Sequence, residues 1–320
     1  MKTMVEEINY TVESPVLFLN FNRPDLTAKT FKKIRSVKPN RLYIAFDGPR
    51  PDRPDDLTLC QEVRKITEAV DWDCKVERLY RTENLGCKAA VSSAISWFFE
   101  QEIEGIILED DCLPEEDFFY FCDQMLTKYR YDTRIFTITG TNLQDGKRWG
   151  NASYYFSQYS NIWGWATWKR VWENYDVNLS RYHEKDIADH LNNLFSNKFL
   201  VESWIEIFKK LKAGEIDTWD YQLNFYTFFG NGLCITPNVN LISNIGFRSD
   251  ATHVNTNLHY SAIPIGKLDD MIHPIYFTPN KAADYYFLSR ELQIEEKMKR
   301  YKKDQLLRRR LKRWIKKLFI

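Results

Sequence analysis

The sequence contains no run of about 18 apolar residues, so none of its segments matches a membrane-spanning helix. The first fourteen residues carry Lys2 and three glutamates and lack the apolar core of a secretory signal. The six cysteines form no CxxC pair, and their spacing matches neither a zinc site nor a disulfide framework. We therefore expect a cytoplasmic protein with reduced thiols.

Glycine is also scarce, with 12 in 320 residues, and none lies between Asn20 and Asp25 after the first predicted strand. Sugar nucleotidyltransferases use a Gly-rich phosphate loop there, so its absence counts against that class. A strong net charge is absent too, with 45 basic and 44 acidic residues. Residues 297–320 hold 12 of the bases and one acid, so the rest of the chain is acidic, which argues against nucleic acid as a partner.

The first 140 residues alternate short β-rich apolar runs with longer segments of helical period. This alternation is typical of an α/β fold with a mostly parallel, Rossmann-like sheet and flanking helices. The predicted strands are 15–21, 41–46, 74–79, 105–110 and 134–139, and the predicted helices are 25–36, 55–69, 86–102 and 115–130.

After Gly140 the chain becomes rich in aromatic residues, with helical stretches near 182–195, 199–213 and 218–229. No low-complexity linker separates the two halves, so we expect the second to pack onto the sheet of the first. The predicted division is one domain over 1–280, with halves 1–140 and 141–280, followed by a helical tail over 281–320.

Ligands of open parallel sheets bind at the carboxyl ends of the strands, so the residues that leave each strand are the candidates. The first strand is followed by Asn22 and Arg23, and the guanidinium suits a diphosphate or a base carbonyl. The second strand is followed by Asp47 and Gly48. This carboxylate suits ribose hydroxyls or a base N–H, although Asp-Gly is also a plain turn signal.

Three consecutive acids, Glu109, Asp110 and Asp111, follow the buried fourth strand. Adjacent carboxylates repel one another, which favours a divalent cation or an array of sugar hydroxyls beside them. Mg²⁺ or Mn²⁺ held by one or two carboxylates and substrate phosphates fits this arrangement. The alternative is a solvated acidic loop that caps the helix from Glu115.

Two further acids, Asp217 and Asp220, flank Trp219 before an aromatic helix, so one of them is a candidate base with a pKa raised by an apolar wall. An aspartate at a helix N-terminus is, however, normally just a helix cap. In the loop 244–256, Arg248 and His253 are candidates for closing over phosphates, although a lone histidine is more often a surface or packing residue.

The EDD triplet at 109–111, the motifs Leu113-Pro114 and Asp117-Phe118-Phe119, NIWGWATWKRVW at 161–172 and TWDYQ at 218–222 form an ordered set. Together they resemble the nucleotide-diphospho-sugar glycosyltransferases of GT-A fold. The similarity is greatest to bacterial hemolysin-like relatives of N-acetylglucosaminyltransferase I, and it spans roughly residues 14–260.

The resemblance implies that Asp111 ligates Mn²⁺ or Mg²⁺, that Glu109 and Asp110 lie near the nucleotide sugar, and that Asp47 lies by the nucleobase. It also implies a catalytic base at Asp220. The eukaryotic enzyme has two consecutive acids in that motif and uses the second, whereas here Tyr221 follows, so Asp217 is the fallback. Residues 1–140 become the nucleotide-sugar-binding half and 141–280 the acceptor-binding half.

The function implied is a metal-dependent inverting transfer of a sugar, from a UDP-linked or similar donor, to a glycan or lipid-linked acceptor hydroxyl. Trp163, Trp165 and Trp168 are candidates for stacking on sugars, although aromatic clusters more often form core. The alternatives are a non-catalytic, membrane-associated nucleotide- or glycan-binding protein and, less favoured, a sugar nucleotidyltransferase.

The tail, residues 294–320, places an apolar stripe on one helical face and bases on the rest. The stripe consists of Leu307, Leu311, Trp314, Ile315 and Leu318. This pattern is typical of an interfacial helix on anionic lipid, so we expect a peripheral protein on the inner face of the cell membrane. A solvated face, a partner-docking helix and a nucleic-acid patch are the other interpretations.

Overall fold

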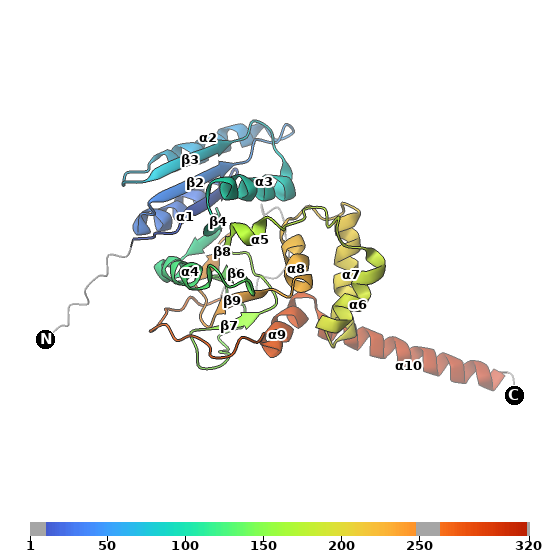
Figure 1. Cartoon of the computed structure of the whole chain (residues 1–320). Coiled ribbons are helices and arrows are strands. Elements are labelled where there is room, and N and C mark those ends of the chain that lie inside the picture. Colours follow the sequence, from blue (N-terminus) through green and yellow to red (C-terminus); the bar gives the residue numbers. More distant parts are fainter. Residues whose placement is uncertain (1–10, 248–262, 319–320) are drawn as a thin grey trace. The chain divides into compact units, whose positions relative to one another are not determined.

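The computed structural model describes residues 11–247 and 263–318, which belong to two compact units (Figure 1). The first unit comprises the chain up to Val177 and Asp217–Asn280, and the second comprises Asn178–Ile216 and Lys281–Ile320. Residues 178–216 group with the C-terminal helices in the second unit. The division into a domain over 1–280 and a tail over 281–320 stays a prediction. The α/β class is confirmed, since the first unit is a mostly parallel sheet with flanking helices.

Within the described residues the sheet has eight strands in the order β3-β2-β1-β4-β8-β6-β9-β7. All of them except β7 and β8 run in one direction. A separate antiparallel pair joins β5 to β10. The bounds are β1 Val16–Asn20, β2 Arg41–Phe46, β3 Lys75–Tyr80, β4 Glu104–Glu109, β5 Cys112–Pro114, β6 Ile135–Thr139, β7 Tyr154–Ser157, β8 Trp165–Trp168, β9 Leu233–Pro237 and β10 Ile242–Asn244.

The helices of the first unit begin and end within two residues of the predicted bounds in the first 140 residues. Pro24 and Pro54 open α1 and α2, where the fixed φ of proline suits a helix and the missing N–H has no partner to lose. The bounds are α1 Pro24–Val37, α2 Pro54–Glu68, α3 Gly86–Gln101, α4 Glu116–Tyr129, α5 Lys169–Trp172 and α8 Asp220–Phe229.

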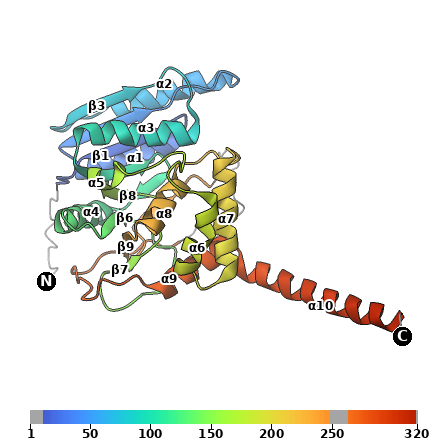
Figure 2. The ribbon, with the colours of Figure 1, turned by 45° about the vertical axis from the view of Figure 1, so that its right-hand side comes forward.

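Strand β1 shows how the sheet is covered on both faces. Val16 and Phe18 lie in a core cluster with residues of α1, α2 and α4, whereas Leu17 and Leu19 lie in a cluster with residues of α3 and α8. Successive side chains of a strand point to opposite faces, so α3 and α1 cover opposite sides. In Figure 2, α3 lies in front of the strands. All five β1 residues are buried, as expected of a central parallel strand.

The aromatic region after Gly140 contains two strands, β7 and β8, that the sequence analysis did not predict. β8 is inserted antiparallel between β4 and β6, and all four of its residues are buried. A strand buried on both faces has no alternation of polar and apolar residues, so its pattern gives no period-2 signal. The sequence analysis expected the second half to pack onto the sheet of the first, whereas β8 is part of that sheet.

The register of the first four strands aligns their carboxyl ends. Asn20 pairs with Phe46, Phe46 pairs with Tyr80, and Leu19 pairs with Glu109. The residues that leave β1, β2, β3 and β4 therefore meet at one edge of the sheet. This is the edge at which α/β sheets bind ligands.

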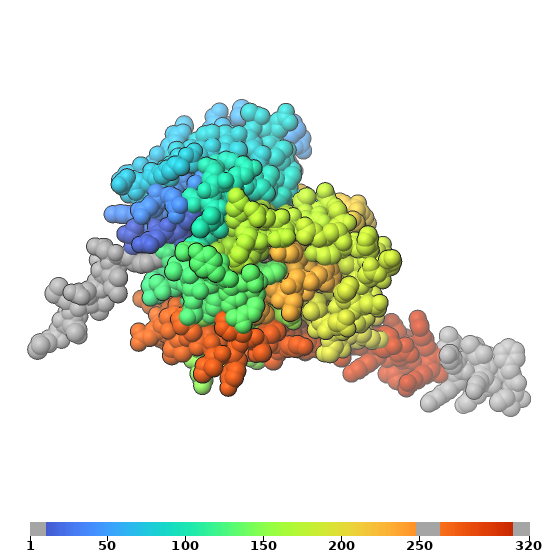
Figure 3. Space-filling view, viewed as in Figure 1, coloured from blue at the N-terminus to red at the C-terminus, as the bar shows by residue number. Residues whose placement is uncertain are grey.

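The second unit is helical and consists of α6 Glu184–Leu194, α7 Lys198–Lys212, α9 Lys281–Glu291 and α10 Ile294–Leu318. The first turns of α10 pack on α7: Ile294 is fully buried, Lys297 Nζ donates to Ser203 Oγ at 2.7 Å, and Tyr301 meets Phe199. Beyond these turns the side chains of Leu306 and Leu307 are exposed. Figure 3 shows this part of α10 in red. No helix in the described segments combines the length and apolar composition needed to cross a bilayer.

Candidate functional site

A pocket of about 660 Å³ lies in the first unit at the carboxyl ends of β1, β2, β3 and β4. Its wall comes from the segments that follow each of these strands, together with the first turns of α2 and α3 and Asp217. A pocket of this size is typical of small-molecule and cofactor sites. The strand-exit rule therefore located the pocket from sequence.

Arg23 joins the exit of β1 to the acidic triplet. Its Nε donates to Asp110 Oδ2 at 3.3 Å, its Nη2 donates to Asp110 Oδ1, and its Nη1 donates to Asp111 Oδ2 at 3.0 Å. The Asp110 side chain is 3% exposed and that of Asp111 is 17% exposed. The guanidinium thus lies between two carboxylates that would otherwise repel each other, and its single charge offsets part of theirs. Thr30 Oγ1 fixes the backbone by donating to the Asp110 carbonyl at 2.8 Å.

Glu109 is the third acid of the triplet and lines the pocket. The pKa of Glu109 is raised to about 8, first by burial and then by the charges of Asp111 and Asp110, while Arg23 opposes the shift. The charge of Asp220 also raises the pKa of Glu109, because the two carboxylates lie within electrostatic range of each other. Burial is likewise the main cause that raises the pKa of Asp110 to about 6.

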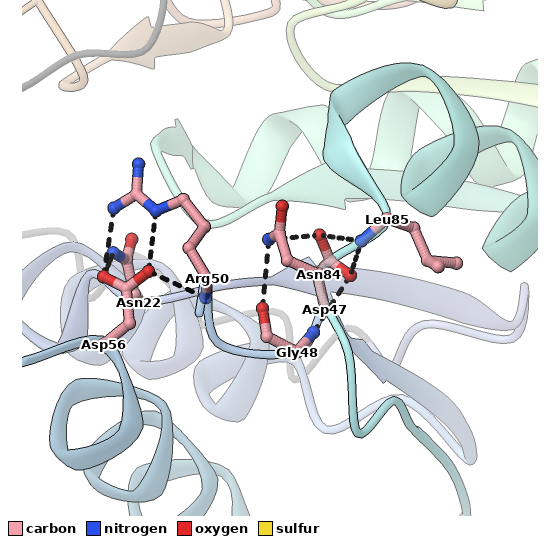
Figure 4. A network of polar contacts seen from close by, with 7 residues as sticks. All are labelled: Asn22, Asp47, Gly48, Arg50, Asp56, Asn84 and Leu85. Atoms are coloured by element: carbon pink, nitrogen blue, oxygen red, sulfur yellow. Dashed lines mark hydrogen bonds and ion pairs between the residues drawn. The ribbon is translucent and has the colours of Figure 1, made fainter. Parts of the chain in front are cut away.

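Asp47 connects two loops at the pocket (Figure 4). Its Oδ1 accepts from the backbone N–H of Gly48 at 2.9 Å and of Leu85 at 3.0 Å, and its Oδ2 accepts from Asn84 Nδ2 at 2.8 Å. Asn84 also donates to the Gly48 carbonyl at 3.0 Å. Both carboxylate oxygens are therefore engaged by the protein, and direct contact between Asp47 and a nucleobase stays a prediction.

Asp56 forms a second network on the other side of the pocket (Figure 4). Arg50 grips its carboxylate with Nε at 2.7 Å and Nη2 at 3.0 Å, and Asn22 Nδ2 donates to Oδ1 at 2.7 Å. The hydrogen bonds from Arg50 hold the pKa of Asp56 below its usual range. The sequence analysis selected Asn22 but missed Arg50 and Asp56; the signal for Arg50 was its place directly after the Asp-Gly-Pro exit of β2.

Asp217 caps a helix that lies far away in the sequence. Its Oδ2 accepts from the Cys87 N–H at 3.1 Å and its Oδ1 from the Lys88 N–H at 3.2 Å, at the start of α3. Gly86, with φ +75°, lies so close that an added Cβ would approach Asp217 Oδ2 to 2.9 Å. The carboxylate thus satisfies two N–H groups that the helix leaves unpaired. This engagement favours Asp220 over Asp217 as the candidate base.

Asp220 is the first residue of α8 and is half-buried. The Thr218 hydroxyl donates to its Oδ1. Its charge raises the pKa of Glu109 and of the buried Tyr175 phenol, for which burial is the larger cause. The Asp220 carboxylate therefore lies close enough to Glu109 for their charges to interact.

The tryptophans divide into core and half-buried residues. Trp165 is 1% exposed and its indole stacks on Trp219 at 5.5 Å, and Trp168 is also 1% exposed. The prediction that Trp165 stacks on a sugar is corrected here, because neither of these indoles offers a free face. Trp163 is half-buried and meets Phe247 edge-on at 5.4 Å. Arg248 and His253, the candidates for closing over phosphates, lie outside the described residues.

The site contains no group of three or more His, Cys, Asp or Glu side chains suited to a metal ion, within residues 11–247 and 263–318. Mg²⁺ and Mn²⁺ bound with a nucleotide need fewer protein ligands, because phosphates and water complete the shell. Asp111 is half-buried and more open to solvent than Asp110, so it fits such a role once its bond to Arg23 Nη1 is released. Its other oxygen accepts from Cys112 Sγ at 3.5 Å.

No protein-family model matches the chain, and no curated protein is detectably similar to it in sequence. Among solved structures, UDP-glucose pyrophosphorylase complexed with UDP-glucose is 9% identical, with 70% of this chain and 90% of that chain covered and a TM-score of 0.34. Mouse xyloside xylosyltransferase 1 is 12% identical, with 68% and 81% covered and a TM-score of 0.33. HddC from Yersinia pseudotuberculosis is 12% identical, with 51% and 80% covered and a TM-score of 0.30. Likeness at this level carries no functional argument, so the function is argued from the residues.

Proposed function

We propose that the chain is an inverting glycosyltransferase that moves a sugar from a nucleotide-diphosphate donor, UDP-linked as the resemblance implies, to an acceptor hydroxyl. The observation that carries the proposal is the acidic triplet at the exit of β4. Glu109, Asp110 and Arg23 line the 660 Å³ pocket, and Arg23 bonds Asp110 and Asp111. The charge of Asp220 acts on Glu109. A pocket at the carboxyl ends of parallel strands is a common place for a nucleotide to bind.

Five pocket residues and Asp220 have parts in this reaction. Arg23 and Asn22 face the donor, with the Arg23 guanidinium suited to the diphosphate. Glu109 and Asp110 lie beside the nucleotide sugar, and the loop held by Asp47 forms the nucleobase end. Asp220 takes the proton from the acceptor hydroxyl as that oxygen attacks the anomeric carbon from the face opposite the diphosphate. Attack from that face inverts the anomeric configuration.

A divalent cation, Mn²⁺ or Mg²⁺, fits this site through Asp111. When bound, such a cation supplies Lewis-acid stabilisation of the departing diphosphate. The half-buried Trp163 is the remaining candidate for stacking on a sugar. Arg248 and His253 stay candidates for phosphate contacts in the donor complex.

Two alternative functions can be distinguished by the products they would give. A sugar nucleotidyltransferase would release pyrophosphate from a nucleoside triphosphate and a sugar phosphate, and the glycine-free exit of β1 disfavours it. A non-catalytic binding protein would bind the nucleotide and transfer nothing.

The experiment is to incubate the full chain with a panel of nucleotide sugars and glycan or lipid-linked acceptors, and to measure released nucleoside diphosphate and glycosylated product. We expect transfer with one donor, and we expect Asp220→Asn to lower kcat by about 10²–10⁴-fold while UDP binding is unchanged. Asp217→Asn is the matched control. Near-wild-type kcat in Asp220→Asn would reject Asp220 as the base, and nucleotide binding without product on the panel would favour the non-catalytic rival.

We also propose that α10 holds the protein at an anionic membrane surface, where a lipid-linked acceptor would be found. The support is the charge: residues 297–320 carry 12 bases and one acid, and Leu306 and Leu307 are exposed beyond the packed first turns. Clustered bases are drawn to anionic lipid, and apolar side chains on the same helix insert at the headgroup boundary.

A further inference from the structure

We propose that Arg23 is a built-in counter-ion that blocks divalent cation binding by the free protein and is released from Asp111 only by a nucleoside diphosphate. This inference rests on the proposed function and deepens it, because it names how cation and donor depend on each other. The juxtaposition that carries it is one guanidinium shared between Asp110 and Asp111 in the pocket wall.

The two halves of the guanidinium have unequal partners. Nε and Nη2 both hold Asp110, which is 3% exposed, whereas Nη1 alone holds Asp111, which is 17% exposed. The hydrogen bond from Arg23 to Asp111 can therefore break while the buried Asp110 carboxylate keeps its counter-ion. Arg23 itself is one-quarter exposed, so its Nη1 edge can turn to a ligand in the pocket.

The same contact opposes a cation. In the described state one oxygen of Asp111 accepts from Arg23 at 3.0 Å and the other accepts from the Cys112 thiol at 3.5 Å. A divalent cation on this carboxylate would also lie a few ångströms from a full positive charge, and like charges at that distance repel. In the free protein, cation binding at Asp111 is therefore opposed by the contacts of its two oxygens and by the charge of Arg23.

A diphosphate reverses both effects. Its oxygens give the guanidinium a new bidentate partner, and they supply the ligands that a Mg²⁺- or Mn²⁺-type cation lacks on this protein. Each ligand therefore favours the other, and by linkage the gain in affinity is the same in both directions. Arg50, which grips Asp56 in the same pocket, touches none of the acids of the triplet and has no part in this exchange.

The test is a Mn²⁺ titration of the full chain, with bound metal followed by the loss of the free Mn²⁺ electron paramagnetic resonance signal. It is run without nucleotide and with UDP, on wild type, Arg23→Gln and the matched control Arg50→Gln. We expect wild type and Arg50→Gln to retain Mn²⁺ only with UDP. We expect Arg23→Gln to bind Mn²⁺ alone about tenfold or more tightly than wild type does.

Circular dichroism checks that Arg23→Gln is folded. If it is not, Arg23→Lys replaces it, because one ammonium does not span both carboxylates, and an intermediate gain in Mn²⁺ affinity is then expected. The inference is overturned if wild type binds Mn²⁺ without UDP within threefold of its affinity with UDP, or if folded Arg23 variants behave as wild type. If UDP has no effect on wild type although Arg23→Gln gains Mn²⁺ affinity, the release step of the inference is overturned and the nucleotide-donor proposal is rejected with it. If UDP promotes Mn²⁺ binding but folded Arg23 variants behave as wild type, the inference alone fails.

Discussion

The acidic triplet of the first unit and the outer part of α10 in the second are both strongly charged. They differ in whether the charge is buried beside a counter-ion or exposed to water. In the triplet, Asp110 is almost fully buried and its charge is matched by a forked guanidinium. On α10, Arg308 and Arg309 are exposed and lie in a run of bases. Water solvates the second kind of charge but not the first.

The difference teaches where a charge change has consequences. Removing one partner of a buried pair leaves the other ion without water or counter-ion, whereas removing an exposed base leaves nothing stranded. Charge in the triplet should therefore control the stability of the first unit. Charge on α10 should control binding to an external surface and leave stability unchanged.

The largest effect on stability is expected from Arg23→Met. This change strands Asp110 and Asp111, so we expect the free energy of unfolding to fall by about 3 kcal/mol in urea denaturation. Arg35→Met is the matched control, because Arg35 pairs with Asp71 where both side chains are more than half exposed, and a loss below about 0.5 kcal/mol is expected. Equal losses in the two variants would contradict the contrast between buried and exposed charge.

The next effect is a pH dependence that Glu109 imposes. Because the pKa of Glu109 is raised to about 8 in the folded state, the folded protein keeps a proton that the unfolded chain has lost. Stability contributed by this group therefore falls as pH rises from about 4.5 to about 8, by at most about 1.4 kcal/mol per pH unit.

The measurement is the free energy of unfolding between pH 7 and 8, where most of the titration of Asp110, with its pKa of about 6, is complete. We expect the wild type to lose stability across this interval and Glu109→Gln to lose less, since the amide carries no proton equilibrium. Parallel pH profiles for the two proteins would show that Glu109 is ionised in the folded state.

Sequence reasoning predicted the elements around the triplet well because they repeat a simple pattern. Each apolar strand there is followed by a helix with a clear 3.6-residue period, and the strand-exit rule then places Arg23, Asp47 and Glu109 together. It failed for β8, whose Trp165 is buried on an inserted antiparallel strand, since burial on both faces removes the alternating signal.

The partners of the site residues were also beyond sequence reasoning. Asp217 and Cys87 are 130 residues apart, and only the fold brings the carboxylate to the start of α3. Asp47 read equally as a ligand contact or a turn residue, and its contacts with Leu85 and Asn84 depend on how two loops meet. Spacing along the chain carries no information on such long-range contacts.

A smaller effect on stability is expected at Asp217, an exposed residue whose side chain caps α3. Asp217→Ala removes the acceptor for two N–H groups, so we expect a loss of about 1 kcal/mol and faster hydrogen exchange at Cys87 and Lys88. Asp217→Asn keeps an acceptor oxygen and should recover part of the loss. Unchanged exchange in Asp217→Ala would show that water replaces the cap at no cost.

The smallest effect on stability, and the sharpest test of the contrast, is expected on α10. In Arg308→Gln/Arg309→Gln we expect the free energy of unfolding to stay within about 0.5 kcal/mol of wild type, because no buried group loses a partner. Sedimentation with phosphatidylserine-containing vesicles should show binding weakened about tenfold or more, since each base near an anionic surface contributes about 1 kcal/mol.

The control Lys29→Gln/Lys32→Gln removes the same charge from exposed positions of α1 and should leave vesicle binding unchanged. Vesicles of phosphatidylcholine alone separate charge from apolar insertion, because they keep the apolar boundary and lack the negative surface. If both double variants lose binding equally, net charge and not α10 draws the protein to lipid. If wild type binds neutral vesicles as well as anionic ones, the bases of α10 are solvated like any surface charge, and the two regions differ only in burial.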